Sequence, residues 1–138
     1  MIAFGAREIF RMAEKISPPA RVLVVDDEAL IRWSLNERLS SAGYEVEEAG
    51  DGVSALDYFR EGAPRIDLVV LDLKLPDADG VDLLKNIKRL CPTCRVIMMT
   101  AFGTPEKLVD ARNSGAYDVV AKPFNLDKML QIVERALA

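Results

Sequence analysis

From Arg21 to the end of the chain, short apolar runs alternate five times with longer amphipathic segments. The runs are rich in β-branched residues and end in polar ones, which predicts strands, whereas the segments between them have helical spacing. The predicted strands cover 21–26, 44–49, 67–72, 94–100 and 117–122, and the predicted helices cover about 28–41, 52–61, 80–90, 104–114 and 125–137. This alternation predicts an α/β fold.

The composition of the predicted strands indicates how they are arranged. VLVV (22–25), LVVL (68–71) and VIMM (96–99) are unbroken apolar runs, typical of central strands in a parallel sheet covered by helices on both faces. YEVEE (44–48) alternates, so it belongs nearer an edge. We therefore expect an open, doubly wound, five-stranded parallel sheet, whose ligands bind at the carboxyl ends of the strands.

Composition narrows the possible functions. The chain has 138 residues, half of them apolar, which suits a single domain with its own core. Its net charge of -4 is unfavourable next to a phosphate backbone, so we expect no direct nucleic acid binding. The absence of histidine excludes a His-based triad and the common His-containing metal sites. Two cysteines and no apolar run of roughly 18 residues favour a cytoplasmic protein without membrane contact.

Residues 1–20 form an N-terminal extension and linker, and residues 21–138 form the domain. Apolar residues recur at helical spacing up to Ile16, and Ser17-Pro18-Pro19 then ends the pattern. One interpretation is a weakly ordered extension, with Met12 as an alternative initiator; the other is a helix that docks on a partner. We favour the first.

Polar residues gather where the predicted strands end. Asp26, Asp27 and Glu28 follow the first strand, Asp72 ends the third, Thr100 ends the fourth and Lys122 ends the fifth. Three aspartates at one sheet edge repel one another unless a hard divalent cation lies among them, and Mg²⁺ fits best. Asp72 would keep a nucleophilic oxygen, and the Thr100 hydroxyl and Lys122 ammonium could hold the other oxygens of a phosphoryl group.

Four motifs stand on these strand ends: VLVVDDE (22–28), LDLKLPDADG (71–80), MTAFG (99–103) and AKPF (121–124). In this order they closely resemble the receiver domains of two-component response regulators, over about residue 21 to the C-terminus. The resemblance implies a flavodoxin-like receiver fold with strand order 2-1-3-4-5. GAYDVVAKPF (115–124) looks most like receivers attached to AAA+ transcription activators.

The resemblance also implies a metal site and a role for each residue in it. Asp72 is phosphorylated, Asp27 binds Mg²⁺ directly, Asp26 helps to hold the water shell of the ion, and the Lys74 carbonyl is a further ligand. The phosphoryl group comes from a partner sensor histidine kinase. The domain thus catalyses only its own phosphorylation and dephosphorylation.

Thr100 and Lys122 contact the phosphoryl oxygens in the family, and the bond before Pro123 is a cis peptide that aims the lysine. Lys74 and Phe102 flank the path of the hydrolytic water, so a bulky aromatic at Phe102 should slow dephosphorylation. Phosphorylation changes the surface of the helix at 104–114, the strand at 117–122 and the last helix, a surface that also serves for homodimers. The chain is either a stand-alone regulator or part of a longer protein.

One departure from the family concerns the switch residues. The family usually places Tyr or Phe three residues before the lysine, and Val119 stands there. Residues two apart on a strand share a face, so Tyr117 is a candidate replacement that repacks as Thr100 moves toward the phosphoryl group. The alternative is that Tyr117 is an aromatic with one rotamer, in the core or facing a partner.

Other interpretations fit less well. A Mg²⁺-dependent phosphohydrolase would have an acid two residues after Asp72, where Lys74 stands, and a degenerate interaction module would have lost acidic residues. A nucleotide-binding Rossmann domain is disfavoured because no glycine-rich turn follows the first strand. Cys91 and Cys94 are expected to be structural, because no second pair or histidine completes a zinc site.

Overall fold

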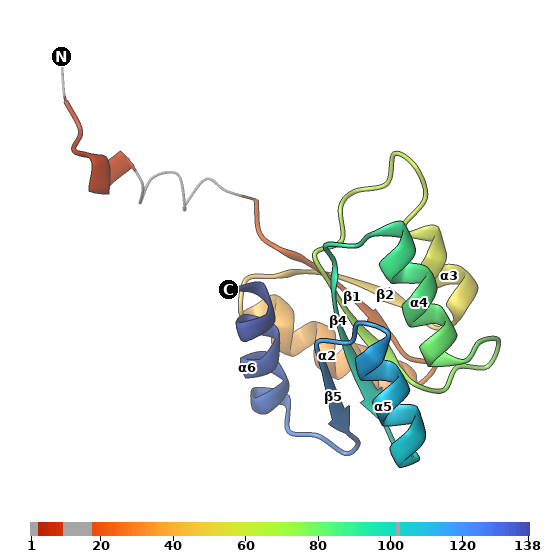
Figure 1. Cartoon of the computed structure of the whole chain (residues 1–138). Coiled ribbons are helices and arrows are strands. Elements are labelled where there is room, and N and C mark those ends of the chain that lie inside the picture. Colours follow the sequence, from red (N-terminus) through yellow and green to blue (C-terminus); the bar gives the residue numbers. More distant parts are fainter. Residues whose placement is uncertain (1–2, 10–17, 102) are drawn as a thin grey trace.

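The computed structural model describes residues 3–9, 18–101 and 103–138, and Figure 1 shows a central sheet with helices on both sides. The strands are β1 (Arg21–Val25), β2 (Glu45–Ala49), β3 (Leu68–Asp72), β4 (Arg95–Thr100) and β5 (Asp118–Ala121). The helices are α2 (Ala29–Ser41), α3 (Gly52–Asp57), α4 (Gly80–Leu90), α5 (Pro105–Asn113) and α6 (Leu126–Leu137). The predicted alternation is confirmed.

The five strands are all parallel, and their order is β2-β1-β3-β4-β5. Val24 of β1 pairs with Glu48 on one side and Val70 on the other, which puts the alternating β2 at an edge. Both the strand order and the edge position of β2 agree with the sequence. Parallel pairing brings the carboxyl ends of all five strands to one edge of the sheet.

The sheet separates two apolar cores, one on each face. Leu23, Val25 and Leu71 pack with residues of α3, α4 and α5, including Leu84. Val22, Val24 and Val70 face the other way and pack with α2 and α6, as Leu39 and Val133 do. In Figure 1, α2 and α6 lie on one side of the sheet, and α3, α4 and α5 lie on the other. These two cores fix the sheet between its helices.

Short polar side chains set the start of most helices. The N-cap side chain accepts backbone N–H groups of the first turn in four helices, which stabilises each start. These caps are Asp51 for α3, Asp79 for α4, Thr104 for α5 and Asn125 for α6. Gly43 and Gly115 have positive φ just after α2 and α5, and Gly62 has positive φ in the turns that follow α3.

The bounds of the elements lie within one residue of the sequence prediction, except at the end of α3. The helix predicted at 52–61 ends at Asp57 and continues as turns, in which Tyr58 and Phe59 donate to carbonyls three residues back. The strand predicted from 117 begins at Asp118, although the Tyr117 N–H already donates to the Val96 carbonyl at 2.7 Å. Tyr117 therefore stands at the entrance of β5.

The helix expected in the N-terminal extension falls partly outside the described residues. Residues 6–9 are helical, whereas Met12 and Ile16 belong to the part that the structure does not describe. None of the helices in the described ranges is long and apolar enough to cross a membrane.

Candidate functional site at the carboxyl ends of the strands

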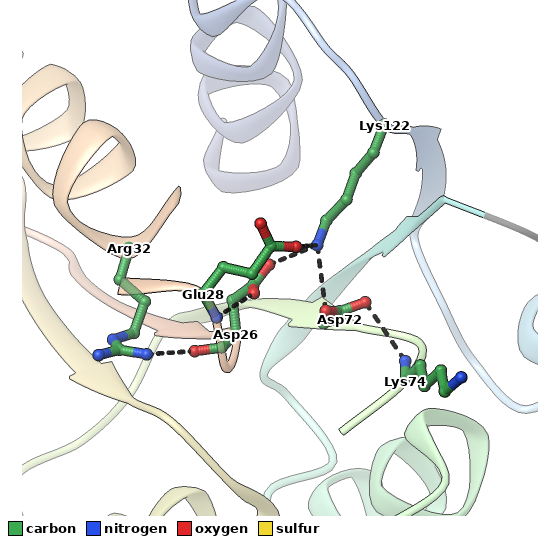
Figure 2. Close-up of polar contacts among 6 residues, drawn as sticks. All are labelled: Asp26, Glu28, Arg32, Asp72, Lys74 and Lys122. Atoms are coloured by element: carbon green, nitrogen blue, oxygen red, sulfur yellow. Dashed lines mark hydrogen bonds and ion pairs between the residues drawn. The ribbon is translucent and has the colours of Figure 1, made fainter. Parts of the chain in front are cut away.

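The predicted site residues meet at the carboxyl edge of the sheet. Asp26 follows β1, Asp72 ends β3, Thr100 ends β4, and Lys122 follows β5. Figure 2 shows the Lys122 side chain reaching down between Asp26 and Asp72. The peptide bond between Lys122 and Pro123 is cis, as the sequence resemblance implied.

Asp26 is completely buried, and hydrogen bonds occupy both of its carboxylate oxygens. Oδ1 accepts the Glu28 N–H at 2.8 Å, and Oδ2 accepts the Lys122 ammonium at 2.6 Å. Its carbonyl accepts Nη1 of Arg32 at 2.6 Å. A buried carboxylate with both oxygens bound to protein suits a supporting position better than direct coordination of a metal.

Asp72 is nearly buried, with 6% of its surface exposed. Oδ2 accepts the Lys122 ammonium at 3.0 Å, and Oδ1 accepts the Lys74 N–H at 3.2 Å. Burial raises the pKa of the Asp72 carboxyl and the charge of Asp26 adds to the rise, while the two hydrogen bonds offset part of it. Asp72 is thus a partly desolvated carboxylate in contact with one cation.

Lys122 has its ammonium between two acids. Burial acts to lower the pKa of Lys122, but the hydrogen bonds to Asp26 and Asp72 together outweigh it, so the pKa stands above its usual value. The exposed Glu28 lies farther away, with 3.8 Å between Nζ and Oε1. Lys122 is therefore a charged lysine held in place, and not a surface amine.

Asp27 completes a set of three carboxylates. Oxygen atoms of Asp26, Asp27 and Asp72 lie within 4.8 Å of one another, the only such acidic or thiol cluster in the ranges that the structure describes. The Asp27 side chain is exposed and has no hydrogen-bond or ion-pair partner among the described residues. The Lys74 carbonyl likewise accepts no hydrogen bond from any described residue. Hard oxygen atoms without protein partners are what a Mg²⁺ site requires, so these residues fit the ion.

The side chain of Thr100 has a buried hydroxyl group without a hydrogen-bond partner among the described residues. It lines a cleft of about 710 Å³ together with Asp27, Asp72, Lys74, Lys107 and Lys122. We call this hollow the carboxyl-end cleft. A buried hydroxyl is costly to leave unpaired, so an acceptor that enters the cleft would be bound favourably by this group.

Comparison with known proteins agrees with this geometry. The family model described as "Response regulator receiver domain" matches residues 22–134. The chain belongs to this family. Receiver domains are the phosphoacceptor regulatory domains of two-component signalling, and they take phosphate from histidine kinases.

Three matches illustrate the breadth of the family. The chemotaxis protein CheY of Bacillus subtilis is 37% identical over 85% of this chain and 97% of its own length. The DNA-binding transcriptional regulator NtrC of Bradyrhizobium is 40% identical over 88% of this chain but only 25% of its own length. A CheY-like receiver structure from Methanospirillum hungatei covers 86% of this chain and 94% of its own, with 34% identity and a TM-score of 0.82. The likeness to receivers of transcription activators, expected from residues 115–124, is confirmed.

Of the expected switch residues of this receiver domain, Thr100 ends β4, Val119 lies on β5, and Tyr117 lies just before β5. Val119 is half-buried and packs against the core on the α3, α4 and α5 side. Tyr117 is 40% exposed, and the guanidinium of Arg95 lies 5.7 Å from the centre of its ring. Phe102 is outside the described residues.

Sequence reasoning missed several polar contacts around the cleft of the receiver. Asp77 accepts the N–H groups of Gly52 at 2.7 Å and Val53 at 3.1 Å, and so ties the loop after β3 to α3. Lys107 of α5 lines the carboxyl-end cleft, and no motif drew attention to it. Because Asp77 lies two residues before the cap of α4, its position could have suggested a turn. Nothing in the sequence indicates that its side chain binds the start of α3.

The two cysteines of the receiver are free, and neither belongs to the acidic cluster at the carboxyl ends of the strands. Cys94 is buried, and burial raises its pKa to about 12, with the neighbouring Cys91 adding to the rise. A thiol held protonated is a poor nucleophile, in agreement with the structural role that the sequence predicted.

Proposed function

We propose that this receiver accepts a phosphoryl group on Asp72 from the phosphohistidine of a sensor kinase, in a Mg²⁺-dependent reaction. An Asp72 carboxylate oxygen attacks the phosphorus, the bond from phosphorus to the histidine nitrogen breaks, and the imidazole leaves with a proton. Asp72 suits this role because it is the one carboxylate at the site that contacts both Lys122 and the Lys74 N–H.

The chain's own residues have separate tasks in this reaction. Asp27, Asp72 and the Lys74 carbonyl would hold Mg²⁺, with Asp26 in support, and the ion would supply positive charge for the phosphoryl oxygens. Lys122, already within 3.0 Å of Asp72, offers its ammonium to one phosphoryl oxygen. The same residues position water for the self-catalysed hydrolysis that ends the signal.

The observation that supports this proposal most strongly is the buried Thr100 hydroxyl without a partner. In the unphosphorylated protein this hydroxyl donates to no acceptor among the described residues. A phosphoryl oxygen on Asp72 would provide that acceptor. The proposal therefore predicts that this hydroxyl matters to transfer and not to the unphosphorylated fold.

Thr100→Val tests this, because valine keeps the shape and removes the hydroxyl. The variant should be as stable as wild type or slightly more stable, since an unpaired buried polar group disappears. Its phosphorylation by phosphoramidate with Mg²⁺ should slow on the order of 10-fold or more. Thr100→Ser, which keeps the hydroxyl, should retain most of the rate. A Thr100→Val variant that is destabilised yet phosphorylated at the wild-type rate would contradict the proposal.

We further propose that phosphorylation changes the surface formed by α5, β5 and α6, and that a partner or a second copy of the chain binds there. With Val119 in place of the usual aromatic, Tyr117 moves as Thr100 is drawn toward the phosphoryl group. Tyr117→Ala should then leave phosphorylation of Asp72 intact and uncouple it from association. If beryllofluoride drives the same association in Tyr117→Ala, Tyr117 has no part in transmission.

The remaining proposals concern the setting. We propose that residues 1–20 are an extension and linker outside the receiver of 21–138. The domain itself contacts neither membrane nor nucleic acid. It works in the cytoplasm, where free thiols such as Cys91 and Cys94 stay reduced.

A further inference from the structure

Lys107 also lines the carboxyl-end cleft, and the chemistry proposed above does not use its ammonium. The residue lies in the first turn of α5, where its N–H donates to the Thr104 hydroxyl at 3.2 Å. Its side chain is half-exposed and lines the same cleft as Asp72, Thr100 and Lys122. A long, flexible ammonium at this place can reach several oxygen atoms of the cleft.

The present partner of Lys107 is Asp79, with 3.6 Å between Nζ and Oδ2. The other oxygen of Asp79 accepts the N–H groups of Val81 at 2.8 Å and Asp82 at 3.3 Å, which caps α4. The ion pair therefore crosses the cleft from α5 to the loop between β3 and α4. Both side chains are at least 40% exposed, so water screens the pair and its contribution is small.

A phosphoryl group on Asp72 would compete with Asp79 for this ammonium. The acyl phosphate carries a charge of about -2 in place of the single negative charge of the carboxylate, and it brings three strong acceptor oxygens. The ammonium of Lys122 is already shared between Asp26 and Asp72. Asp79 stands next to Gly80, where an added Cβ would lie 2.6 Å from the Asp72 carbonyl, so the present partner of Lys107 borders the phosphoacceptor.

The backbone just before α5 also lies close to Thr100. A Cβ added to Gly103 would lie 3.2 Å from the Thr100 hydroxyl and 2.8 Å from Cδ2 of Leu108, so the Gly103 backbone is packed between the two side chains. Leu108 follows Lys107 directly on α5. A displacement of Lys107 toward the cleft would therefore move the same helical turn that Thr100 contacts through Gly103.

We propose that phosphorylation of Asp72 makes Lys107 exchange Asp79 for the phosphoryl oxygens, which draws the first turn of α5 toward the cleft. This rests on the proposed function of Asp72. It gives the receiver a charged connection from the phosphoryl group to α5, independent of any aromatic at position 119.

The test uses two substitutions with opposite expected effects on the affinity for beryllofluoride, measured by calorimetry with Mg²⁺. Lys107→Met keeps the length of the side chain and removes the charge, so the affinity should fall about tenfold or more. Asp79→Asn keeps an oxygen that caps α4 but releases Lys107, so the affinity should rise by roughly 2- to 5-fold. If the ion pair served only the fold, both variants would lose affinity together.

A second readout follows α5 itself. Beryllofluoride should slow amide hydrogen exchange across residues 105–113 in wild type, less so in Lys107→Met, and Lys107→Arg should restore much of the effect. The proposal is contradicted by an unchanged affinity in Lys107→Met, or by an unchanged or lowered affinity in Asp79→Asn. Asp72→Asn distinguishes failure of the proposed function from failure of this inference. If Asp72→Asn still binds beryllofluoride, the proposed function of Asp72 is wrong. If Asp72→Asn does not bind it but Lys107→Met binds it with wild-type affinity, only the proposed role of Lys107 is wrong.

Discussion

The ammonium of Lys122 lies 2.6 Å from Oδ2 of Asp26, although 96 residues separate them in the sequence. Because Asp26 is fully buried, removing this cation leaves a carboxylate without its charged partner. We expect Lys122→Met to lower the free energy of unfolding by about 1–3 kcal/mol in EDTA. Mg²⁺ should recover more stability in the variant than in wild type, since the ion neutralises the same acids.

Urea unfolding with and without Mg²⁺ measures both effects. Lys128→Met is a matched control, because Lys128 is exposed on α6 and forms no ion pair with the described residues. Equal Mg²⁺ effects in wild type and Lys122→Met would show that the lysine and the ion do not share a site.

Asp27 gives the opposite prediction for stability. Its carboxylate is exposed, close to two other acids and unpartnered within the described residues, so Asp27→Asn should be at least as stable as wild type in EDTA. The rise in melting temperature that Mg²⁺ produces should be lost. Asp82→Asn, which changes an exposed acid on α4, should keep that rise. An Asp27→Asn variant that Mg²⁺ still stabilises fully would refute the ligand assignment.

Asp77 should matter for folding and little for phosphoryl transfer. It accepts two N–H groups at the start of α3, so Asp77→Ala should cost about 1 kcal/mol of stability, as the loss of a helix cap does. Asp51→Ala removes the N-cap of the same helix and should cost a similar amount. The measurement is chemical unfolding beside phosphorylation kinetics, and a large loss of rate in Asp77→Ala would contradict this assignment.

The Cys94 thiol predicts a pH dependence. Its pKa rises from 9.0 to about 12 on folding, because burial disfavours the thiolate. A raised pKa contributes stability that is complete below the unfolded value and is lost as pH rises toward the folded value. Between pH 9 and 12, wild type should therefore lose stability relative to Cys94→Ala, by about 1.4 kcal/mol per pH unit at most. Urea midpoints of wild type and Cys94→Ala at rising pH check this.

Much of the fold could be predicted because its signals are local. Apolar runs such as LVVL mark buried strands by themselves, and Gly43 or Gly115 mark helix ends through the backbone they permit. The end of α3 at Asp57 could not be read this way, since Leu56, Tyr58 and Phe59 all pack against the same core whether they lie in a helix or in turns. Tertiary packing decided that boundary.

The site could be predicted as a set of residues but not as a network. Strand ends identified Asp26, Asp72, Thr100 and Lys122, because a parallel sheet brings those ends together. Which of these residues form hydrogen bonds with one another depends on the directions that their side chains take in the folded chain. No sequence pattern says that Lys122 bonds to Asp26 more closely than to Asp72. Contacts between loops and other helices, such as that of Lys107 with Asp79, are equally invisible until the chain is folded.

The most direct test of the account is the site of phosphorylation itself. Wild type incubated with phosphoramidate and Mg²⁺ should gain one phosphoryl group by intact-mass analysis, labile in alkali as an acyl phosphate is. Peptide mapping should place it on Asp72, Asp72→Asn should gain none, and Asp82→Asn should be modified like wild type. An Asp72→Asn variant that gains the same group at the same rate would contradict the assignment of Asp72 as the phosphoacceptor.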